Sequence, residues 1–232
     1  MSTDDLTPEN LPGYAAETDD RSAFIRSVYT HLFAAIAAFT GLEYLFFTTG
    51  FAEQFAVFAL SQSWLAILGA FIVVSWIASH VAHRVESKPL QYLALYGFVV
   101  AEALIFVPML YIALAIEPKI VSSAATFTLL AFAALTAIAW FSGRDFSFLR
   151  SFLMWGGVIA LGTIVMGIVF GFELGTYFSM AMIGFAGASI LYDTSKIMRA
   201  YPDDRSIAAA LELFASVALM FWYVLRLFLA RR

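Results

Sequence analysis

Apolar residues follow one another along most of the chain in stretches of about 20, long enough to cross the hydrocarbon core of a bilayer as a helix. Within each stretch they are continuous and do not alternate with polar residues, which excludes the strands of a membrane barrel. The pattern predicts an all-α polytopic membrane protein with a seven-transmembrane-helix bundle. The expected spans are 27–48, 62–82, 90–115, 120–141, 148–170, 174–197 and 207–229.

The segments between these spans are short and contain glycine or proline, so none can hold a soluble domain. The first 20 residues carry six acids and no base, a composition typical of disorder. We therefore expect a disordered acidic tail over 1–22 and a single transmembrane domain over 23–232. Of the chain, 62% is hydrophobic and 13% charged, too apolar for a soluble domain of this length.

Basic residues in the connections predict how the bundle is oriented. Cytoplasmic connections carry an excess of Lys and Arg, and a cytoplasmic N-terminus places nine basic residues inside and four outside. The nine are Arg21, Arg26, Arg84, Lys88, Arg144, Arg150, Lys196, Arg199 and Arg205, and the four are Lys119, Arg226, Arg231 and Arg232. The basic C-terminus is discordant, and an even number of crossings with one re-entrant span would place it inside.

Four carboxylates lie inside or at the end of apolar stretches: Glu43, Glu102, Asp193 and Glu212. A charge in hydrocarbon is costly, so an intramembrane acid indicates a functional site by default. Together these four predict a polar or titratable pathway through the bundle.

Several segments around these acids resemble one family. The segment ILYDTSKI at 190–197 resembles the sixth-helix motif of the Bax inhibitor family of membrane proteins. GRDFSFLRSFL at 143–153 is similar to the family's connection between the fourth and fifth helices. RSVY at 26–29 followed by Gly41 resembles its first helix, and AALELF at 209–214 with LRL at 225–227 resembles its last.

The resemblance implies seven helices with a central seventh, and a pH-sensitive calcium leak through them. It implies that Asp193 pairs with an aspartate of the last helix and that basic residues near the cytoplasmic mouth help to set the gate. Here that aspartate is replaced by Ser216. The serine form resembles a bacterial branch linked to membrane proteolysis, so the alternative is a non-conducting regulator of a membrane protease or other membrane complex. A bacterial inner membrane is the expected location.

Each candidate acid also has a structural interpretation. Asp193 is expected to gate with Ser216 as its hydrogen-bond partner, or else to cap a helix end or pair with Lys196 or Arg199. Glu212 lies four residues before Ser216 on the same helix face, which makes it a candidate second carboxylate or an acid reaching the headgroups.

The remaining candidates are polar residues elsewhere in the bundle. Glu102 is the deepest acid and is expected to face the interior. Glu43 marks an outer vestibule or, more simply, the interface. His31 is a pH-responsive partner for Asp193 or a satisfied polar group. Arg84 is either a positive-inside anchor or the counter-charge to Asp193.

Other function classes find no support in the residues. The three lysines all lie at span ends, which argues against a retinal Schiff base, and no His-Glu-x-x-His or Gly-x-Ser-x-Gly motif is present. Oxygen-rich loops for tight calcium binding and basic patches for nucleic acid are also missing. We therefore expect no enzyme, no cofactor and no resident metal. The expected partners are the lipid bilayer, calcium or protons as transported ions, and a membrane protease complex in the regulator interpretation.

The charge distribution makes a test of orientation possible. Reporter proteins fused after Pro118 and after Gly143 should lie on opposite sides of the membrane, with the second in the cytoplasm. An external signal from the fusion after Gly143 would overturn the assignment.

Overall fold

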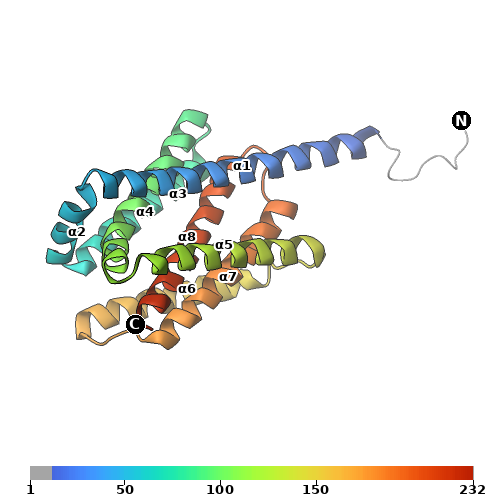
Figure 1. Cartoon of the computed structure of the whole chain (residues 1–232). Coiled ribbons are helices and arrows are strands. Elements are labelled where there is room, and N and C mark those ends of the chain that lie inside the picture. The colour runs from blue at the N-terminus through green and yellow to red at the C-terminus, as the bar shows by residue number, and fades with distance from the viewer. Residues whose placement is uncertain (1–11, 232) are drawn as a thin grey trace, which may run out of the picture.

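The computed structural model describes residues 12–231, which form eight α-helices (Figure 1). In chain order they are α1 (Pro12–Thr48), α2 (Phe51–Ser61), α3 (Trp64–Arg84), α4 (Lys88–Ile116), α5 (Pro118–Phe141), α6 (Leu149–Phe170), α7 (Thr176–Arg199) and α8 (Ser206–Leu229). The expected all-α architecture is confirmed. The predicted spans from 62 onwards coincide with α3 to α8 to within two residues at each end.

The first helix is longer than the sequence pattern indicated. α1 begins at Pro12, so 12–22, expected to be part of a disordered tail, is helical, while 1–11 lies outside the described residues. Proline is compatible with the first turn of a helix, where its missing N–H costs nothing. Farther along, the Arg21 side chain donates to the carbonyls of Ile197 and Met198 at the end of α7. These bonds hold the extension against the bundle.

A short helix occupies part of what was predicted to be a connection. α2 follows Gly50, whose positive φ of 76° makes a left-handed turn that glycine adopts without strain. The buried face of α2 consists of Ala52, Ala56 and Ala59, so it packs closely through small side chains. With 11 residues it is too short to cross a bilayer. Apolar stretches of about 20 residues therefore do not predict α2.

Six helices are long and apolar enough to cross a membrane, namely α1, α3, α4, α5, α6 and α8. α7 has 24 residues, which suffices in length, but its last two turns contain Asp193, Lys196 and Arg199. The prediction of seven spans is thus confirmed for six helices. The remaining predicted span corresponds to α7, which is not among these six helices and also carries Asp193.

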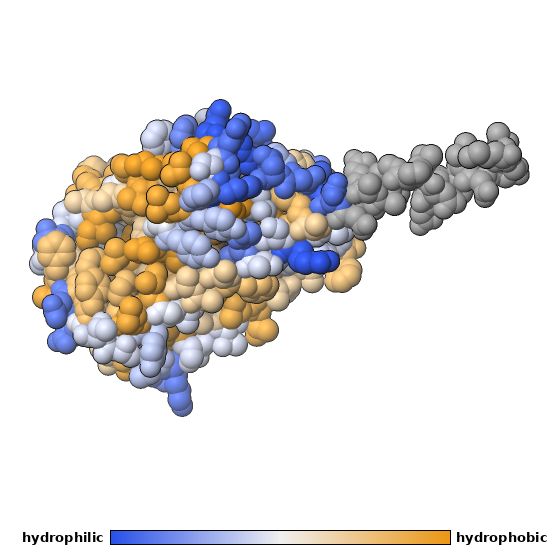
Figure 2. Space-filling view, turned by 90° about the horizontal axis from the view of Figure 1, so that it is seen from above, coloured by the Kyte–Doolittle hydropathy of each residue, from blue (hydrophilic) through white to orange (hydrophobic). Residues whose placement is uncertain are grey.

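α8 is the centre of the bundle. It packs against α1, α3, α4, α5 and α7 and is drawn in red through the middle of Figure 1. In an apolar 18-residue stretch of α8, 72% of the residues are buried, compared with 6% for α6. A helix that is apolar on all sides buries all sides, and α8 does so with small residues such as Ala208, Ala209 and Ala210. Hydrophobic side chains cover much of the face in Figure 2, and hydrophilic ones gather in a band from its upper edge towards the right.

The connections place many of the basic residues at one end of the bundle. Arg21 donates to the carbonyl of Tyr201, Arg205 to that of Val85 and Lys88 to that of Asp204. Arg199 donates in the same way to the carbonyl of Arg144. We call this the basic end. The basic end brings together residues that the sequence assigned to a single side of the membrane.

Close packing of α8 predicts the effect of enlarging its small residues. Ala209→Leu adds bulk at a fully buried position and should lower the free energy of unfolding by about 1–3 kcal/mol, measured in detergent. Ala134→Leu, at an exposed position of α5, is the matched control and should change it little. Equal losses from the two variants would contradict the central position of α8.

Candidate functional site

The predicted hydrogen bond between Asp193 and Ser216 is present. Asp193 on α7 is only 7% exposed, and its Oδ2 accepts a hydrogen bond of 2.6 Å from Ser216 Oγ on α8. The Ser189 hydroxyl lies 3.0 Å from that of Ser216 and one turn from Asp193 on the same face of α7. A buried carboxylate is stabilised by polar partners, and Ser216 provides one for Asp193. Its role as a gate stays a prediction.

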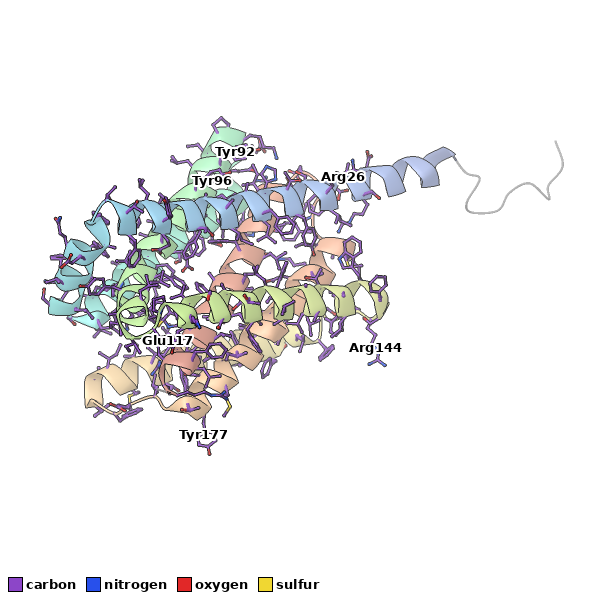
Figure 3. The ribbon with its side chains drawn as sticks, in the orientation of Figure 1. Arg26, Tyr92, Tyr96, Glu117, Arg144 and Tyr177 are labelled. Carbon is purple, nitrogen blue, oxygen red and sulfur yellow. The ribbon has the colours of Figure 1, made fainter. Side chains whose placement is uncertain are left out.

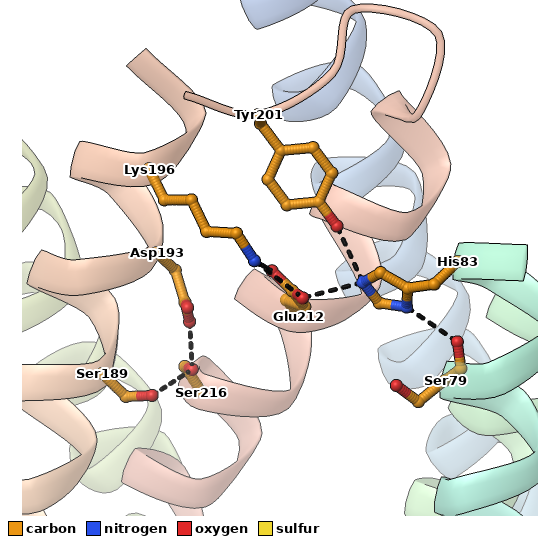
Figure 4. A network of polar contacts seen from close by, with 8 residues as sticks. All are labelled: Ser79, His83, Ser189, Asp193, Lys196, Tyr201, Glu212 and Ser216. Atoms are coloured by element: carbon orange, nitrogen blue, oxygen red, sulfur yellow. Dashed lines mark hydrogen bonds and ion pairs between the residues drawn. The ribbon is translucent and has the colours of Figure 1, made fainter. Parts of the chain in front are cut away.

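Glu212 lies one turn before Ser216 on α8 and joins three helices (Figure 4). Its carboxylate is 2.7 Å from Nε2 of His83 on α3 and 3.0 Å from Nζ of Lys196 on α7. These partners, rather than the headgroups, satisfy it, which corrects the interpretation as a snorkelling acid. Glu212 also has no direct bond to Asp193 among the described residues, so the two carboxylates do not form a dyad. We call His83, Lys196 and Glu212 the ionic cluster.

The hydrogen bonds of His83 define two states of its ring. A carbonyl oxygen can only accept, so Nδ1 carries a hydrogen and donates to the Ser79 carbonyl at 2.7 Å. Nε2 faces both Glu212 and the Tyr201 hydroxyl, which lies 2.9 Å away. A protonated Nε2 donates to Glu212 and makes the ring cationic, whereas an unprotonated one accepts from Tyr201. Protonation of His83 therefore changes the net charge of the ionic cluster while the same side chains stay within hydrogen-bond distance.

Tyr201 is positioned by the N-terminal part of α1. Its ring stacks on Phe24 with 6.1 Å between centroids, and the Arg21 guanidinium binds its carbonyl and forms an ion pair with Asp203. Burial raises the pKa of the Tyr201 phenol above its ordinary range, so the hydroxyl keeps its proton as a donor for His83. Arg21 thereby connects the N-terminal part of α1 to the ionic cluster through Tyr201.

Two cavities lie on either side of these contacts. A cleft of about 700 Å³ extends between α3, α4 and α8, where Ser216 and Ser189 form part of its wall. We call it the large cleft. A cavity of about 340 Å³ at the basic end is lined by Glu212, His83 and Arg84. On α3, Ser75 lines the large cleft and Ser79, one turn later, lines the smaller cavity.

Two predicted partners of Asp193 lie elsewhere. His31 approaches the Ser27 carbonyl at 2.6 Å and the Tyr92 hydroxyl at 2.8 Å, and Tyr92 lies on α4 beside α1 (Figure 3). Arg84 is exposed and makes no bond to Asp193 among the described residues. The physical reason is helix register, since successive residues differ by about 100° around α3 and His83 takes the inward position.

The other two candidate acids are both buried. Glu102 on α4 is 7% exposed and lines the large cleft, as its depth in the sequence indicated. Glu43 on α1 is 8% exposed, and neither of its oxygens has a hydrogen-bond partner among the described residues. Glu43 is therefore packed between helices, and its assignment to an outer vestibule or to the interface stays a prediction.

Sequence reasoning missed part of the site. Lys196 was considered as a partner of Asp193 rather than of Glu212. His83, Tyr201 and Ser189 were not expected at this site. The available signal was the spacing of Ser189, Asp193 and Lys196 along one side of α7. Within the described residues, no group of three or more His, Asp or Glu side chains could hold a metal ion.

Fold and site together define a polytopic α-helical membrane protein with a buried polar contact between its last two helices. Residues 21–232 match the family described as inhibitor of apoptosis-promoting Bax1, and the chain belongs to this Bax inhibitor family.

Two curated relatives agree with the family assignment. The chain is 32% identical to Protein LIFEGUARD 4 of Arabidopsis thaliana over 224 residues, covering 90% of this chain and 85% of the relative. It is 29% identical to Bax inhibitor 1 of Schizosaccharomyces pombe over 215 residues, covering 89% and 76%. Both relatives are eukaryotic, so they lend no support to the expected bacterial location.

The ionic cluster predicts non-additive mutations. His83→Gln and Glu212→Gln each remove one side of the contact between these two residues. The double variant should therefore lose less stability than the sum of the two single losses. The expected coupling is about 0.5–3 kcal/mol in the free energy of unfolding in detergent. His31→Gln combined with Glu212→Gln is the control and should be additive. A coupling near zero for the His83 pair would contradict the contact.

Proposed function

We propose that this protein is a cation leak, permeable to calcium or protons, whose path follows α8 and is closed at the level of Asp193, Ser216 and the ionic cluster. The observation that carries the proposal is the pair of cavities separated by those contacts. Ser75 and Ser79 lie in different cavities although they are one turn apart on α3. A barrier about one helical turn thick, roughly 5 Å, therefore separates them.

The charges along this route favour cations. Glu102 lies in the wall of the large cleft, and Asp193 and Glu212 follow towards the basic end. Rings or rows of carboxylates select cations in pores, and conduction requires that each site bind weakly enough to release its ion. The few oxygen ligands at each level are consistent with weak binding of calcium.

Protonation is the proposed control of the barrier. Ser216 donates its single hydroxyl hydrogen to Asp193, a bond that is strongest with the ionised carboxylate. The groups that surround this contact are Lys196, Glu212 and, beyond them, His83 and Tyr201. A change in the charge of Asp193 or His83 removes or redirects one of these bonds and loosens α7 against α8. A lone carboxylate beside a hydroxyl should respond to pH less steeply than a pair of aspartates.

The contacts between α7 and α8 also support a seventh crossing. The two helices meet through Lys196 and Glu212 at the basic end and through Asp193 and Ser216 farther in. At the opposite end, Arg226 of α8 donates to the carbonyl of Leu174, two residues before α7 begins. α7 therefore extends alongside α8 over most of its length. With seven crossings and the basic end in the cytoplasm, the C-terminus lies on the other side.

A non-conducting regulator of a membrane protease or other membrane complex is the second candidate. It is favoured by Ser216, because the serine removes the carboxylate pair that the family resemblance implies for gating. In this alternative the Asp193 bond to Ser216 holds α7 in place for a partner within the membrane.

Ion flux tests the leak directly. Purified protein in liposomes containing a calcium-sensitive dye should admit calcium at a rate that depends on pH. Asp193→Asn fixes the charge of this side chain and should abolish most of the pH dependence, whereas Ser216→Asp should make it steeper by creating two interacting carboxyls. Glu53→Gln, at an exposed acid of α2, is the control and should match the wild type.

The outcomes separate the two candidates. Flux no greater than in protein-free liposomes would reject the leak and favour the regulator. Identical pH profiles for the wild type and Asp193→Asn would reject Asp193 as the gate even in a conducting protein.

A further inference from the structure

Glu102 is a buried carboxyl group that lines the large cleft and has no partner among the described residues. It is 7% exposed, lines the large cleft, and makes no hydrogen bond or ion pair with any other described residue. A buried acid in an apolar bundle normally pairs with a cation or with hydrogen-bond donors. The large cleft leaves space beside Glu102 for a partner that is not part of the chain, such as a bound ligand.

Aromatic rings surround this carboxylate. Phe98 and Phe106 lie four residues before and after Glu102 on α4, so all three lie on one helix face and line the cleft. Phe71 of α3 is 6.0 Å from Phe98 between ring centroids, and Trp222 of α8 is 5.0 Å from Phe106. Aromatic faces attract cations, and several rings around one site are the arrangement that recognises quaternary ammonium groups.

The walls of the cleft select among cations. They consist mainly of apolar and aromatic side chains, which suit a large, weakly hydrated cation better than a compact inorganic one. A volume of about 700 Å³ is within the range of sites for drug-sized ligands.

The single basic residue of the lining lies away from Glu102. Contacts from Phe98 to Phe214 and from Phe106 to Trp222 place Glu102 at the height of Ala218 on α8. Arg226 comes eight residues later, roughly 12 Å along the helix, and donates to the Leu174 carbonyl. The cleft therefore holds its carboxyl group in its interior and its basic group at its far end.

We propose that the large cleft is a binding site for lipophilic organic cations, in which Glu102 supplies the counter-charge and Phe71, Phe98, Phe106 and Trp222 supply the aromatic walls. The site takes ions whose charge is shielded by alkyl or aryl groups. Its occupancy does not require that the protein conduct, so the proposal is independent of the leak.

Tetraphenylphosphonium is a suitable probe, measured by equilibrium dialysis against purified protein in lipid nanodiscs, with empty nanodiscs subtracted. The wild type should bind about one equivalent, and Glu102→Gln should weaken binding at least tenfold. Glu102→Asp keeps the charge and should retain most of the affinity. Glu43→Gln removes another buried acid outside the cleft lining and should bind like the wild type.

Two further measurements separate charge from apolar contact. Triphenylphosphine oxide has the same aryl groups but no net charge, so it should bind weakly and equally to the wild type and Glu102→Gln. Phe98→Leu keeps the carboxylate and should still weaken tetraphenylphosphonium binding. The proposal is overturned if the wild type binds no more than empty nanodiscs, or if Glu102→Gln binds the cation as tightly as the wild type. Loss of calcium flux with intact cation binding would contradict only the leak.

Discussion

Charged groups inside an apolar bundle are stabilised by partners on neighbouring helices, because lipid offers none. This constraint fixes how α7 and α3 sit against α8. Asp193 finds its donor on Ser216, and Glu212 finds Lys196 on one side and His83 on the other. Moving any of these helices by one turn would leave at least one charge buried alone, at a cost of about 3–5 kcal/mol when a buried pair is broken. The cost is lower for the ionic cluster, because its side chains are partly exposed and solvent screens their charges.

In the proposed function, the same contacts form the barrier that opens. The Asp193 bond is a single hydrogen bond from a hydroxyl, and the His83 ring can direct its Nε2 to either Glu212 or Tyr201. Both bonds depend on which groups carry a proton, and the proposed function uses this dependence to couple helix packing to pH. Arg21 extends this coupling to α1 through Tyr201 and the end of α7. Its bonds explain why the chain is ordered into a helix well before the first apolar stretch.

Much of the fold could be predicted from the sequence because hydrophobic stretches of span length are a strong signal. The starts of α4 and α5 follow from Pro89 and Pro118, and the ends of α5 and α6 from Gly143 and Gly171. α2 could not be found in that way, since it is apolar but short. The polarity of α7, which obscures its crossing, is the same property that revealed Asp193.

The site was predictable only where motif and helix periodicity acted together. Asp193 with Ser216 and the interior position of Glu102 followed from those two signals. The partners of Glu212 did not, because choosing His83 over Arg84 requires the rotation of α3 about its axis. No local pattern sets that rotation, which is fixed by packing against α4 and α8.

The central claim is that the polar contacts between α7, α8 and α3 separate two compartments. The chain contains no cysteine, so single cysteines can be introduced without background reactivity. Ser75→Cys lies in the large cleft and Ser79→Cys in the smaller cavity. In sealed proteoliposomes of known orientation, a membrane-impermeant cationic thiol reagent should label Ser75→Cys only from the side opposite the basic end, and Ser79→Cys only from the side of the basic end. Labelling of both positions from the same side would contradict the account.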